Sequence, residues 1–335
     1  RSEENMTDNT WPTVDTELID DVTLYSAKLI IPVTGPVIID GAVAIHGDRV
    51  VHVGKRRWVL KALKQEMTAH GTIHERHWDG VLTPGLINAH THLQYSGMVQ
   101  VGQGTYDRFR AWELAFNEVY AEAQKTQPWK QWAEDGARQM VESGTTAAAD
   151  IVTDLDAAGA LASQGMHGIA YWEVMGWHNA EWMEKGRTEL IRQLRRMNEE
   201  QLPNLGISPH APYTLESEPF VDLPDIARQL NMRLHIHLAE TPLEAGTYPP
   251  VLTTYSAADW SDHDWESYRQ LKEVGKGASA IQFVDQLGSL GPDVHIAHGV
   301  WANGEDRRIL RQRGVGVALC PRSNRITNTG KDATV

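Results

Sequence analysis

The chain has 335 residues, and its 31 Lys and Arg against 44 Asp and Glu give a formal net charge of −13 at pH 7. This length suffices for one large barrel-type domain, alone or with a small satellite, and for a sizeable hydrophobic core. The acidic balance opposes a polyanionic partner, so we expect no nucleic acid among the partners. The single cysteine, Cys320, excludes an intrachain disulfide and a cysteine-rich zinc cage, so any metal must be held by His and carboxylate groups.

The N-terminal segment RSEENMTDNTWPTVDTELID has no targeting character, because it lacks the basic region and apolar core of a secretory signal. No apolar run approaches the roughly 20 residues that span a bilayer. We therefore expect a polar tail over residues 1–21, a soluble cytoplasmic protein and no membrane partner.

Residues 22–80 predict a small N-terminal antiparallel β module, which the family resemblance described below interprets as part of a β-sandwich. Short β-rich runs, VTLYSAKLIIPV and VIIDGAVAIHGDRVVHVG, alternate with turn residues in this range. Gly47 and Asp48 lie between two alternating apolar segments and predict a tight hairpin turn.

From Val81 onward the chain alternates predicted strands with long predicted helices, such as WELAFNEVYAEAQ and WKQWAEDGARQMVESG. Recurring βα units at this spacing indicate an α/β fold with a parallel sheet and helical crossovers, here a (β/α)8 (TIM-like) barrel over residues 81–335. The pattern gives seven of the eight strands of such a barrel. The predicted strands are 85–92, 145–151, 167–175, 205–210, 232–238, 293–298 and 314–320.

Histidines recur where these predicted strands end. His90 and His92 close the first strand, and His210, His237 and His298 close three later ones. Functional side chains of parallel barrels gather at the carboxyl ends of the strands. His90 and His92 point to the same face of their strand. Alone they are either a hydrogen-bonded structural pair or half of a metal site, and the other strand-end histidines favour the metal site.

Residues near His237 and His298 refine this prediction. Glu240 follows His237 in HLAET, within reach of a metal-bound water, although it could instead be a charge at a helix start. His295 and His298 are three residues apart on a strand and should face opposite sides, so we expect only the terminal His298 in the site. His235 lies one layer deeper than His237 and is expected to pack or to support a ligand.

Three further residues are candidates for substrate contact. His210 in SPHAPYT is equally open to a substrate contact and to a structural turn role. Arg322 in CPRSN could clamp an anionic group, although the structural role is favoured. Trp112, and aromatic residues of the 243–280 segment, lie where loops would cover a planar ring, but packing between helices explains them equally well.

Five motifs taken together, PGLINAHTHL, SPHAPYT, HLAET, AHGVW and CPRSN, resemble the amidohydrolase superfamily over roughly residues 22–335. The resemblance is to its metal-dependent aminohydrolases, such as methylthioadenosine/S-adenosylhomocysteine, aminofutalosine and guanine deaminases and triazine hydrolases. It implies a distorted (β/α)8 barrel beside a small β-sandwich, with one zinc ion, or iron in some members. GISPHAPYT lacks the lysine that bridges two metals in binuclear relatives, so we expect one ion. By motif, the resemblance places the metal ligands on His90, His92 and His237, the proton-shuttling carboxylate on Glu240, the hydroxide-orienting histidine on His298 and a substrate-contacting histidine on His210.

The sequence departs from the family at its C-terminal end. The family's eighth-strand aspartate ligand lies some tens of residues beyond CPRSN, and Asp332 is not its equivalent. The second half of the family's sandwich is also missing before Val335. We therefore expect a barrel truncated before strand 8.

The function that the resemblance implies is zinc-dependent hydrolytic deamination of an aminated heterocycle, an adenosine derivative above all. One alternative is hydrolysis of another C–N or C–Cl bond, as in the guanine- or triazine-type enzymes. The other is a non-catalytic homologue that lacks the strand-8 aspartate. We expect a small-molecule substrate as the partner, and a homodimer is common among proteins that resemble this one.

Overall fold

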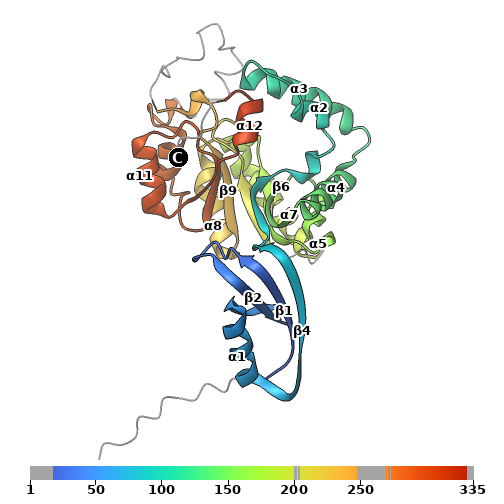
Figure 1. Cartoon of the computed structure of the whole chain (residues 1–335). Helices are drawn as coiled ribbons and strands as arrows, with labels where there is room; N and C mark the ends of the chain where they lie inside the picture. Colours follow the sequence, from blue (N-terminus) through green and yellow to red (C-terminus); the bar gives the residue numbers. More distant parts are fainter. Residues whose placement is uncertain are drawn as a thin grey trace, which may run out of the picture. The chain divides into compact units, whose positions relative to one another are not determined.

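The chain divides into two compact units, Arg1–Gly85 and Leu86–Val335 (Figure 1). No helix in the described part of the chain is long and apolar enough to cross a membrane. The computed structural model describes residues 18–199, 202, 204–246, 269, 271 and 273–329.

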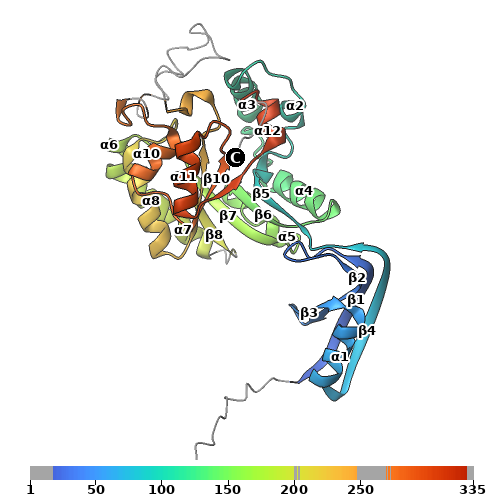
Figure 2. The ribbon, with the colours of Figure 1, turned by 60° about the vertical axis from the view of Figure 1, so that its left-hand side comes forward.

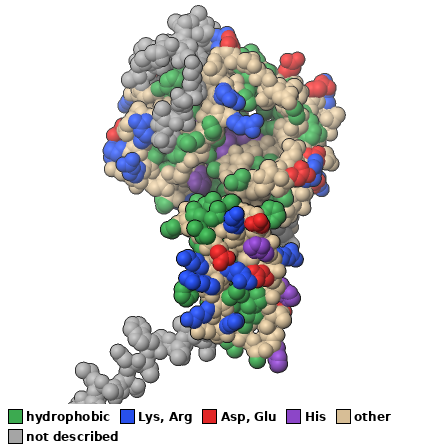
Figure 3. All heavy atoms as spheres, in the orientation of Figure 1, with side chains coloured by type: hydrophobic (Ala, Val, Ile, Leu, Met, Phe, Trp, Pro, Cys, Tyr) green, Lys and Arg blue, Asp and Glu red, His purple; other side chains and the backbone are tan. Residues whose placement is uncertain are grey.

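The smaller unit contains a separate four-stranded sheet with the order β3-β2-β1-β4. The pairs β1–β2 and β2–β3 are antiparallel as predicted, but β1 and β4 pair parallel, so the expectation of an entirely antiparallel module is wrong. Strands β2 and β3 pair antiparallel, and the positive φ of Gly47 (57°) turns the chain between them, which confirms the predicted hairpin. Hydrophobic side chains lie at the surface of this unit (Figure 3). The exposed ones include Val33 and Ile39. Its elements are β1 (Ile19–Ile30), β2 (Ile38–His46), β3 (Arg49–Lys55), α1 (Arg56–Glu66) and β4 (Met67–Leu82).

The larger unit is built on a seven-stranded sheet in which every pair of neighbouring strands is parallel. The strands follow one another in chain order around a barrel-like curve, as the βα rhythm predicted (Figure 2). All seven predicted strands are present. They are β5 (Leu86–Thr91), β6 (Thr145–Val152), β7 (His167–Val174), β8 (Leu205–Pro209), β9 (Arg233–Leu238), β10 (Val294–His298) and β11 (Gly316–Ala318).

Helices cover the outside of this sheet in both ribbon views (Figures 1 and 2). Local signals set their ends, as in α11, which Asn303 caps at its start and Gly314 ends with a positive φ of 70°. The helices are α2 (Val99–Gly102), α3 (Phe109–Ala123), α4 (Trp129–Glu142), α5 (Ala160–Ser163), α6 (Asn179–Glu181), α7 (Arg187–Glu199), α8 (Ser217–Gln229), α10 (Ala280–Gln286), α11 (Gly304–Arg313) and α12 (Pro321–Ile326). Short single turns are η1 (Leu93–Tyr95), η2 (Leu155–Ala157), η3 (Trp182–Gly186) and η4 (Pro242–Glu244).

The main core lies between the sheet and these helices. Ile207, Leu234 and Ile296 of the strands are fully buried, together with Phe220 and Ile281 of the helices. Near-continuous apolar strands suit a sheet that is buried on both faces, and each such side chain contributes about 1.5–3 kcal/mol on burial. The rigid layer that results fixes the positions of the polar residues at the strand ends.

Candidate metal centre and active site

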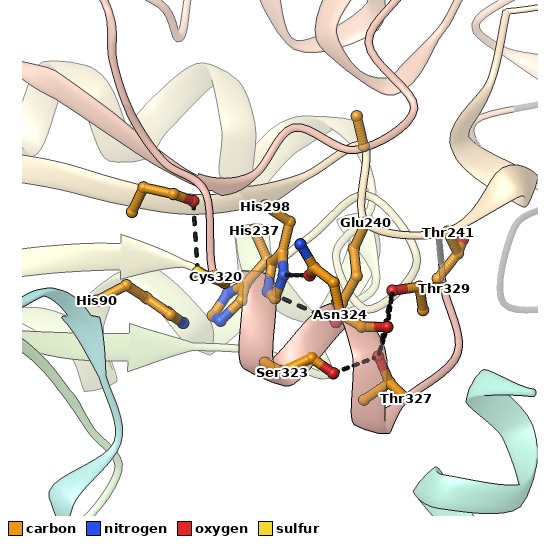
Figure 4. Close-up of polar contacts among 12 residues, drawn as sticks. His90, His237, Glu240, Thr241, His298, Cys320, Ser323, Asn324, Thr327 and Thr329 are labelled. Atoms are coloured by element: carbon orange, nitrogen blue, oxygen red, sulfur yellow. Dashed lines mark hydrogen bonds and ion pairs between the residues drawn. The ribbon is translucent and has the colours of Figure 1, made fainter. Parts of the chain in front are cut away.

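Histidines from β5, β9 and β10 converge at the carboxyl ends of their strands. His92 Nε2 lies 3.2 Å from His237 Nε2. The His90 ring centroid lies 5.0 Å from that of His92 and 4.8 Å from that of His237. Each of these three residues offers one nitrogen, and the three nitrogens lie within 4.8 Å of one another. Figure 4 shows His90, His237 and His298 gathered in this way.

The chemistry of this donor set fits one divalent cation. Tetrahedral zinc with Zn–N bonds of about 2.0–2.1 Å holds its ligand nitrogens about 3.3 Å apart, close to the observed 3.2 Å. Burial lowers the pKa of His92 to about 4 and that of His237 well below its usual value, so both rings are neutral and carry a lone pair. The donor set is uncharged, as in sites where imidazoles bind zinc.

His235 supports His90 from the layer below. Its Nε2 atom lies 2.9 Å from His90 Nδ1, and the two rings are nearly parallel. A hydrogen bond at Nδ1 leaves His90 Nε2 free for the cluster, which is the usual arrangement behind a metal-binding histidine. His235 therefore occupies the deeper, supporting position that its place on the strand predicted.

Glu240 places a carboxyl group beside the histidines. Its Oε1 atom lies 3.5 Å from His298 Nε2, and Tyr213 donates a 3.4 Å hydrogen bond to Oε2. The side chain is buried, and burial raises the pKa of Glu240 to about 8. A carboxyl group with this pKa can take up and release a proton near neutral pH.

Asn324 on α12 fixes the orientation of His298. Its Nδ2 group donates to the Leu319 carbonyl over 2.7 Å, so its Oδ1 atom accepts from His298 Nδ1 over 2.8 Å (Figure 4). His298 Nδ1 therefore carries the hydrogen, and Nε2 faces Glu240 with a lone pair. Asn324 was not predicted as a site residue, because nothing local in the sequence indicates its partner 26 residues earlier.

The end of β10 departs from regular strand alternation. His298 has a positive φ of 77°, and its ring lies 5.7 Å from the rings of both His90 and His237. The His295 ring lies 6.1 Å from that of His235, one layer deeper on the same side of the sheet. The expectation that His295 and His298 face opposite sides is therefore wrong, because the left-handed residue turns the last side chain inward. Of the two, His298 is the one that reaches the cluster.

Glu244 holds the loop that carries Glu240. Its Oε1 atom accepts from the Ala239 amide, and its Oε2 atom accepts from the amides of Glu240 and Thr241, each over 2.9 Å. Ala239 adopts a positive φ of 54° in this loop. Glu244 was not predicted as a site residue, although the spacing of Thr241 and Glu244 in TPLE is the signature of a capping box.

The structure brings one of the three predicted substrate residues into the cluster. The His210 ring lies 4.8 Å from that of His237, and its Nδ1 atom lies 2.7 Å from Thr214 Oγ1. Arg322 is exposed on α12, and among the described residues no hydrogen bond or ion pair joins it to the cluster. Trp112 is half-buried on α3, where it packs against Phe109 and Phe116 at ring distances of 5.3 and 5.5 Å.

A further acidic residue near the cluster was not expected from the sequence. Glu173 on β7 has a buried carboxyl group whose Oε1 atom lies 4.0 Å from His210 Nε2 and 3.9 Å from His237 Nδ1. The signal was an acidic residue in the otherwise apolar strand segment AYWEV. Asp332 and most of the 243–280 segment, including Tyr255, lie outside the described residues.

Comparisons with known proteins agree with this picture. The amidohydrolase family matches residues 81–248, half of the chain. The sequence is similar to 5-methylthioadenosine/S-adenosylhomocysteine deaminases of Thermococcus kodakarensis (30% identity over 73% of this chain) and Moorella thermoacetica (28% over 88%). The chain spans 52% and 62% of the lengths of these two relatives, which is less than two thirds of each.

The fold is similar to solved structures as well. An adenosine deaminase from Xanthomonas campestris with bound zinc superposes with a TM-score of 0.67, at 22% identity over 94% of this chain and 65% of the other. At this identity the likeness concerns the fold alone. It agrees with the barrel-like parallel sheet described above.

Proposed function

The chain belongs to the amidohydrolase family, and on that premise we propose that it is a metal-dependent hydrolase that deaminates an adenosine-type nucleoside. The observation that carries the proposal is the 3.2 Å approach of two neutral imidazole nitrogens, His92 Nε2 and His237 Nε2, with the buried carboxyl of Glu240 on the next loop. The names of the curated relatives support the nucleoside class, since they are deaminases of methylthioadenosine and S-adenosylhomocysteine.

We infer that His90, His92 and His237 hold one divalent cation, with zinc preferred over iron. When bound, such an ion supplies Lewis-acid activation of water, so that a nucleophile is available at neutral pH. The zinc-bound structural relative supports zinc only as a family precedent.

The other residues of the cluster handle protons and orientation. Glu240 takes a proton from the attacking water and delivers it to a ring nitrogen next to the amino-bearing carbon, which makes that carbon electrophilic. His298 presents its Nε2 lone pair beside Glu240 and orients the same water. The C–O bond forms first, and the C–N bond of the tetrahedral adduct then breaks; one hydrogen of the water ends on the ring nitrogen and the other leaves with the amino group as ammonia.

The test combines metal analysis with turnover of 5′-methylthioadenosine and adenosine, followed by ultraviolet absorbance and by ammonia release. Glu240→Gln should retain the metal and lose about 10²- to 10⁴-fold in kcat, the usual contribution of a general acid–base group. Glu184→Gln, at an exposed position on η3, serves as the matched control. Glu240→Gln with wild-type turnover would remove the assigned role of Glu240.

Two results would replace the proposal as a whole. Chloride release from a chlorinated triazine without ammonia release from nucleosides would favour the halide-hydrolysing alternative. Purified protein with no metal, and no activation by added zinc, would favour the non-catalytic homologue. The cytoplasmic location and the homodimer stay predictions from the sequence.

A further inference from the structure

Tyr213 contacts Glu240 through a side-chain hydrogen bond. The Tyr213 hydroxyl donates to Glu240 Oε2 over 3.4 Å, and among the described residues no other side chain donates to this carboxyl group. Glu240 is buried, and a buried carboxyl group depends on the few donors that reach it. A single donor therefore acts on Glu240, and it acts on only one of the two oxygens.

A stiff turn after β8 holds the backbone of Tyr213. The preceding residue is Pro212, whose ring fixes its φ angle. The Ala211 carbonyl accepts from the amides of Thr214 and Leu215, each over 3.0 Å. The Thr214 hydroxyl donates to the same carbonyl over 3.2 Å. The turn thus holds Tyr213 through its own hydrogen bonds.

Two aromatic neighbours hold the ring of Tyr213. Its centroid lies 5.5 Å from the His210 ring at an interplanar angle of 86°, and 6.2 Å from the Phe109 ring at 72°. Both contacts are edge-to-face, an arrangement that aromatic pairs favour. A side-chain rotation that moved the hydroxyl away from Glu240 would break these contacts as well. The donor is therefore fixed in direction.

The two oxygens of Glu240 have unlike neighbours. Oε2 faces the donor, Tyr213, whereas Oε1 lies 3.5 Å from His298 Nε2. That nitrogen carries a lone pair, because His298 Nδ1 donates to Asn324 over 2.8 Å. An oxygen that accepts from a hydroxyl stays bare, and a carboxyl proton belongs on the oxygen that faces an acceptor. The neighbours of Glu240 thus favour a proton on Oε1.

We propose that Tyr213 is a positioning residue that keeps the transferred proton on Oε1 of Glu240. This inference rests on the proposed function. The proton bonds to Oε1 as an O–H bond of the attacking water breaks, and the Oε1–H bond breaks in turn when the proton passes to the ring nitrogen. Tyr213 keeps its own proton throughout. Without its hydroxyl, the proton also occupies Oε2, which faces away from His298 and from the water that His298 orients.

Three other titratable groups lie near Glu240, and none of them donates to its oxygens. Burial lowers the pKa of His298, so this ring is neutral. The Glu244 carboxyl accepts from the backbone amide of Glu240 over 2.9 Å. Burial raises the pKa of the Cys320 thiol to about 11, so the thiol is uncharged at neutral pH. Tyr213 is therefore the neighbouring side chain whose hydroxyl stabilises the charged form of Glu240.

The variant Tyr213→Phe tests the proposal, because it removes the hydroxyl and keeps the ring. It should lower kcat about tenfold, the effect of one long hydrogen bond to a charged group, with metal content and KM as in wild type. Loss of the donor destabilises the carboxylate, which must be charged to take a proton from water. The acidic limb of the kcat profile should therefore move to higher pH by about one unit.

The matched control is Tyr120→Phe, which removes a hydroxyl that accepts from Gln124 at the end of α3. It should leave kcat and the pH profile as in wild type. An acidic limb of Tyr213→Phe at the wild-type pH would overturn the proposal, whatever the value of kcat, because a merely structural role would not move the limb. A rise in KM equal to the fall in kcat/KM would also overturn it, since Tyr213 would then bind the substrate.

Titration of Glu240 itself keeps the test independent of catalysis. Zinc-loaded protein labelled at the side-chain carboxyl carbon of glutamate is titrated by isotope-edited NMR, and the Glu240 resonance is the one that Glu240→Gln lacks. Its midpoint should rise by about one pH unit in Tyr213→Phe and stay unchanged in Tyr120→Phe. That rise would support the proposed contact even if wild type released no ammonia from any nucleoside, in which case the proposed function alone would fail. Equal midpoints in wild type and Tyr213→Phe would overturn the role of Tyr213.

Discussion

Replacement of Glu244 would test how the loop that carries Glu240 is held in place. The Glu244 carboxylate accepts three backbone hydrogen bonds, one at Oε1 from Ala239 and two at Oε2 from Glu240 and Thr241. Glu244→Gln keeps one oxygen as acceptor for the amides of Glu240 and Thr241. Its NH2 group then faces the Ala239 amide, which is left without an acceptor. Glu244→Ala leaves all three amides without an acceptor.

The expected costs follow from this count. A buried donor left without an acceptor costs about 1–3 kcal/mol, so Glu244→Gln should lower the free energy of unfolding by about that amount. Glu244→Ala should lower it by about 3–6 kcal/mol, less than three full penalties, because removal of the buried carboxyl offsets part of the loss. Burial raises the pKa of Glu244 to about 7, which agrees with such a desolvation cost.

The loop should also lose its hold on Glu240. Displacement of this carboxyl should lower kcat by about 10- to 100-fold in Glu244→Gln, because 1.4 kcal/mol corresponds to a factor of ten. Urea unfolding, metal content and steady-state turnover measure these effects, with Glu184→Gln as the exposed control. An unfolding free energy of Glu244→Ala within about 0.5 kcal/mol of wild type, together with unchanged kcat, would refute the reasoning.

Two other predictions concern the metal site and the smaller unit. His235→Gln should weaken metal affinity about 10- to 100-fold, because His90 loses the imidazole that hydrogen-bonds to its Nδ1 atom. Competition with a chromophoric chelator measures the affinity, and His70→Gln, at an exposed position, is the control that should bind metal as wild type does. Equal affinities in the two variants would contradict a role of His235 in holding His90. In the smaller unit, hydrogen bonds from Arg56 lower the pKa of Glu75 from 4.5 to about 2. The contribution of this pair to the free energy of unfolding is therefore fully present above pH 4.5 and is lost as the pH falls through 2. Glu75→Gln should therefore lower the stability of the β1–β4 pair by about 1–2 kcal/mol at pH 7, which amide hydrogen exchange measures. Urea unfolding should show that the difference between the variant and wild type disappears near pH 2. A difference that persists at about pH 2 would contradict the pKa shift as its cause.

The strand pattern was predictable because each strand of a buried parallel sheet is a short apolar run between turn residues. All seven strands lie within about two residues of their predicted ranges, even the short β11. The rule that functional residues follow strand ends then pointed to His90, His92, His237 and His298, which the fold brings together. That these four histidines bind a metal ion or take part in catalysis stays a prediction.

The residues that hold the site in shape were not predictable in the same way. Asn324 and Glu173 have partners 26 or more residues away, which only the folded arrangement of separate strands and of α12 brings close to them. For Trp112 and Arg322 the sequence could not say which side of a helix each occupies. Trp112 packs in a row of aromatic residues on α3, and Arg322 is exposed on α12. The sequence was equally compatible with a position of either side chain in the site.

The left-handed backbone at the strand ends has a consequence for engineering. Ala239, His298 and Cys320 adopt positive φ values of 54°, 77° and 52°, a conformation that side-chain-bearing residues adopt at a cost of order 1 kcal/mol. A screen for heat tolerance alone would thus favour glycine at Ala239 or Cys320. Such variants should tolerate higher temperatures, whereas the backbone next to Glu240 and Asn324 would be less rigid. Selection for stability and selection for turnover should therefore favour different residues at these two positions.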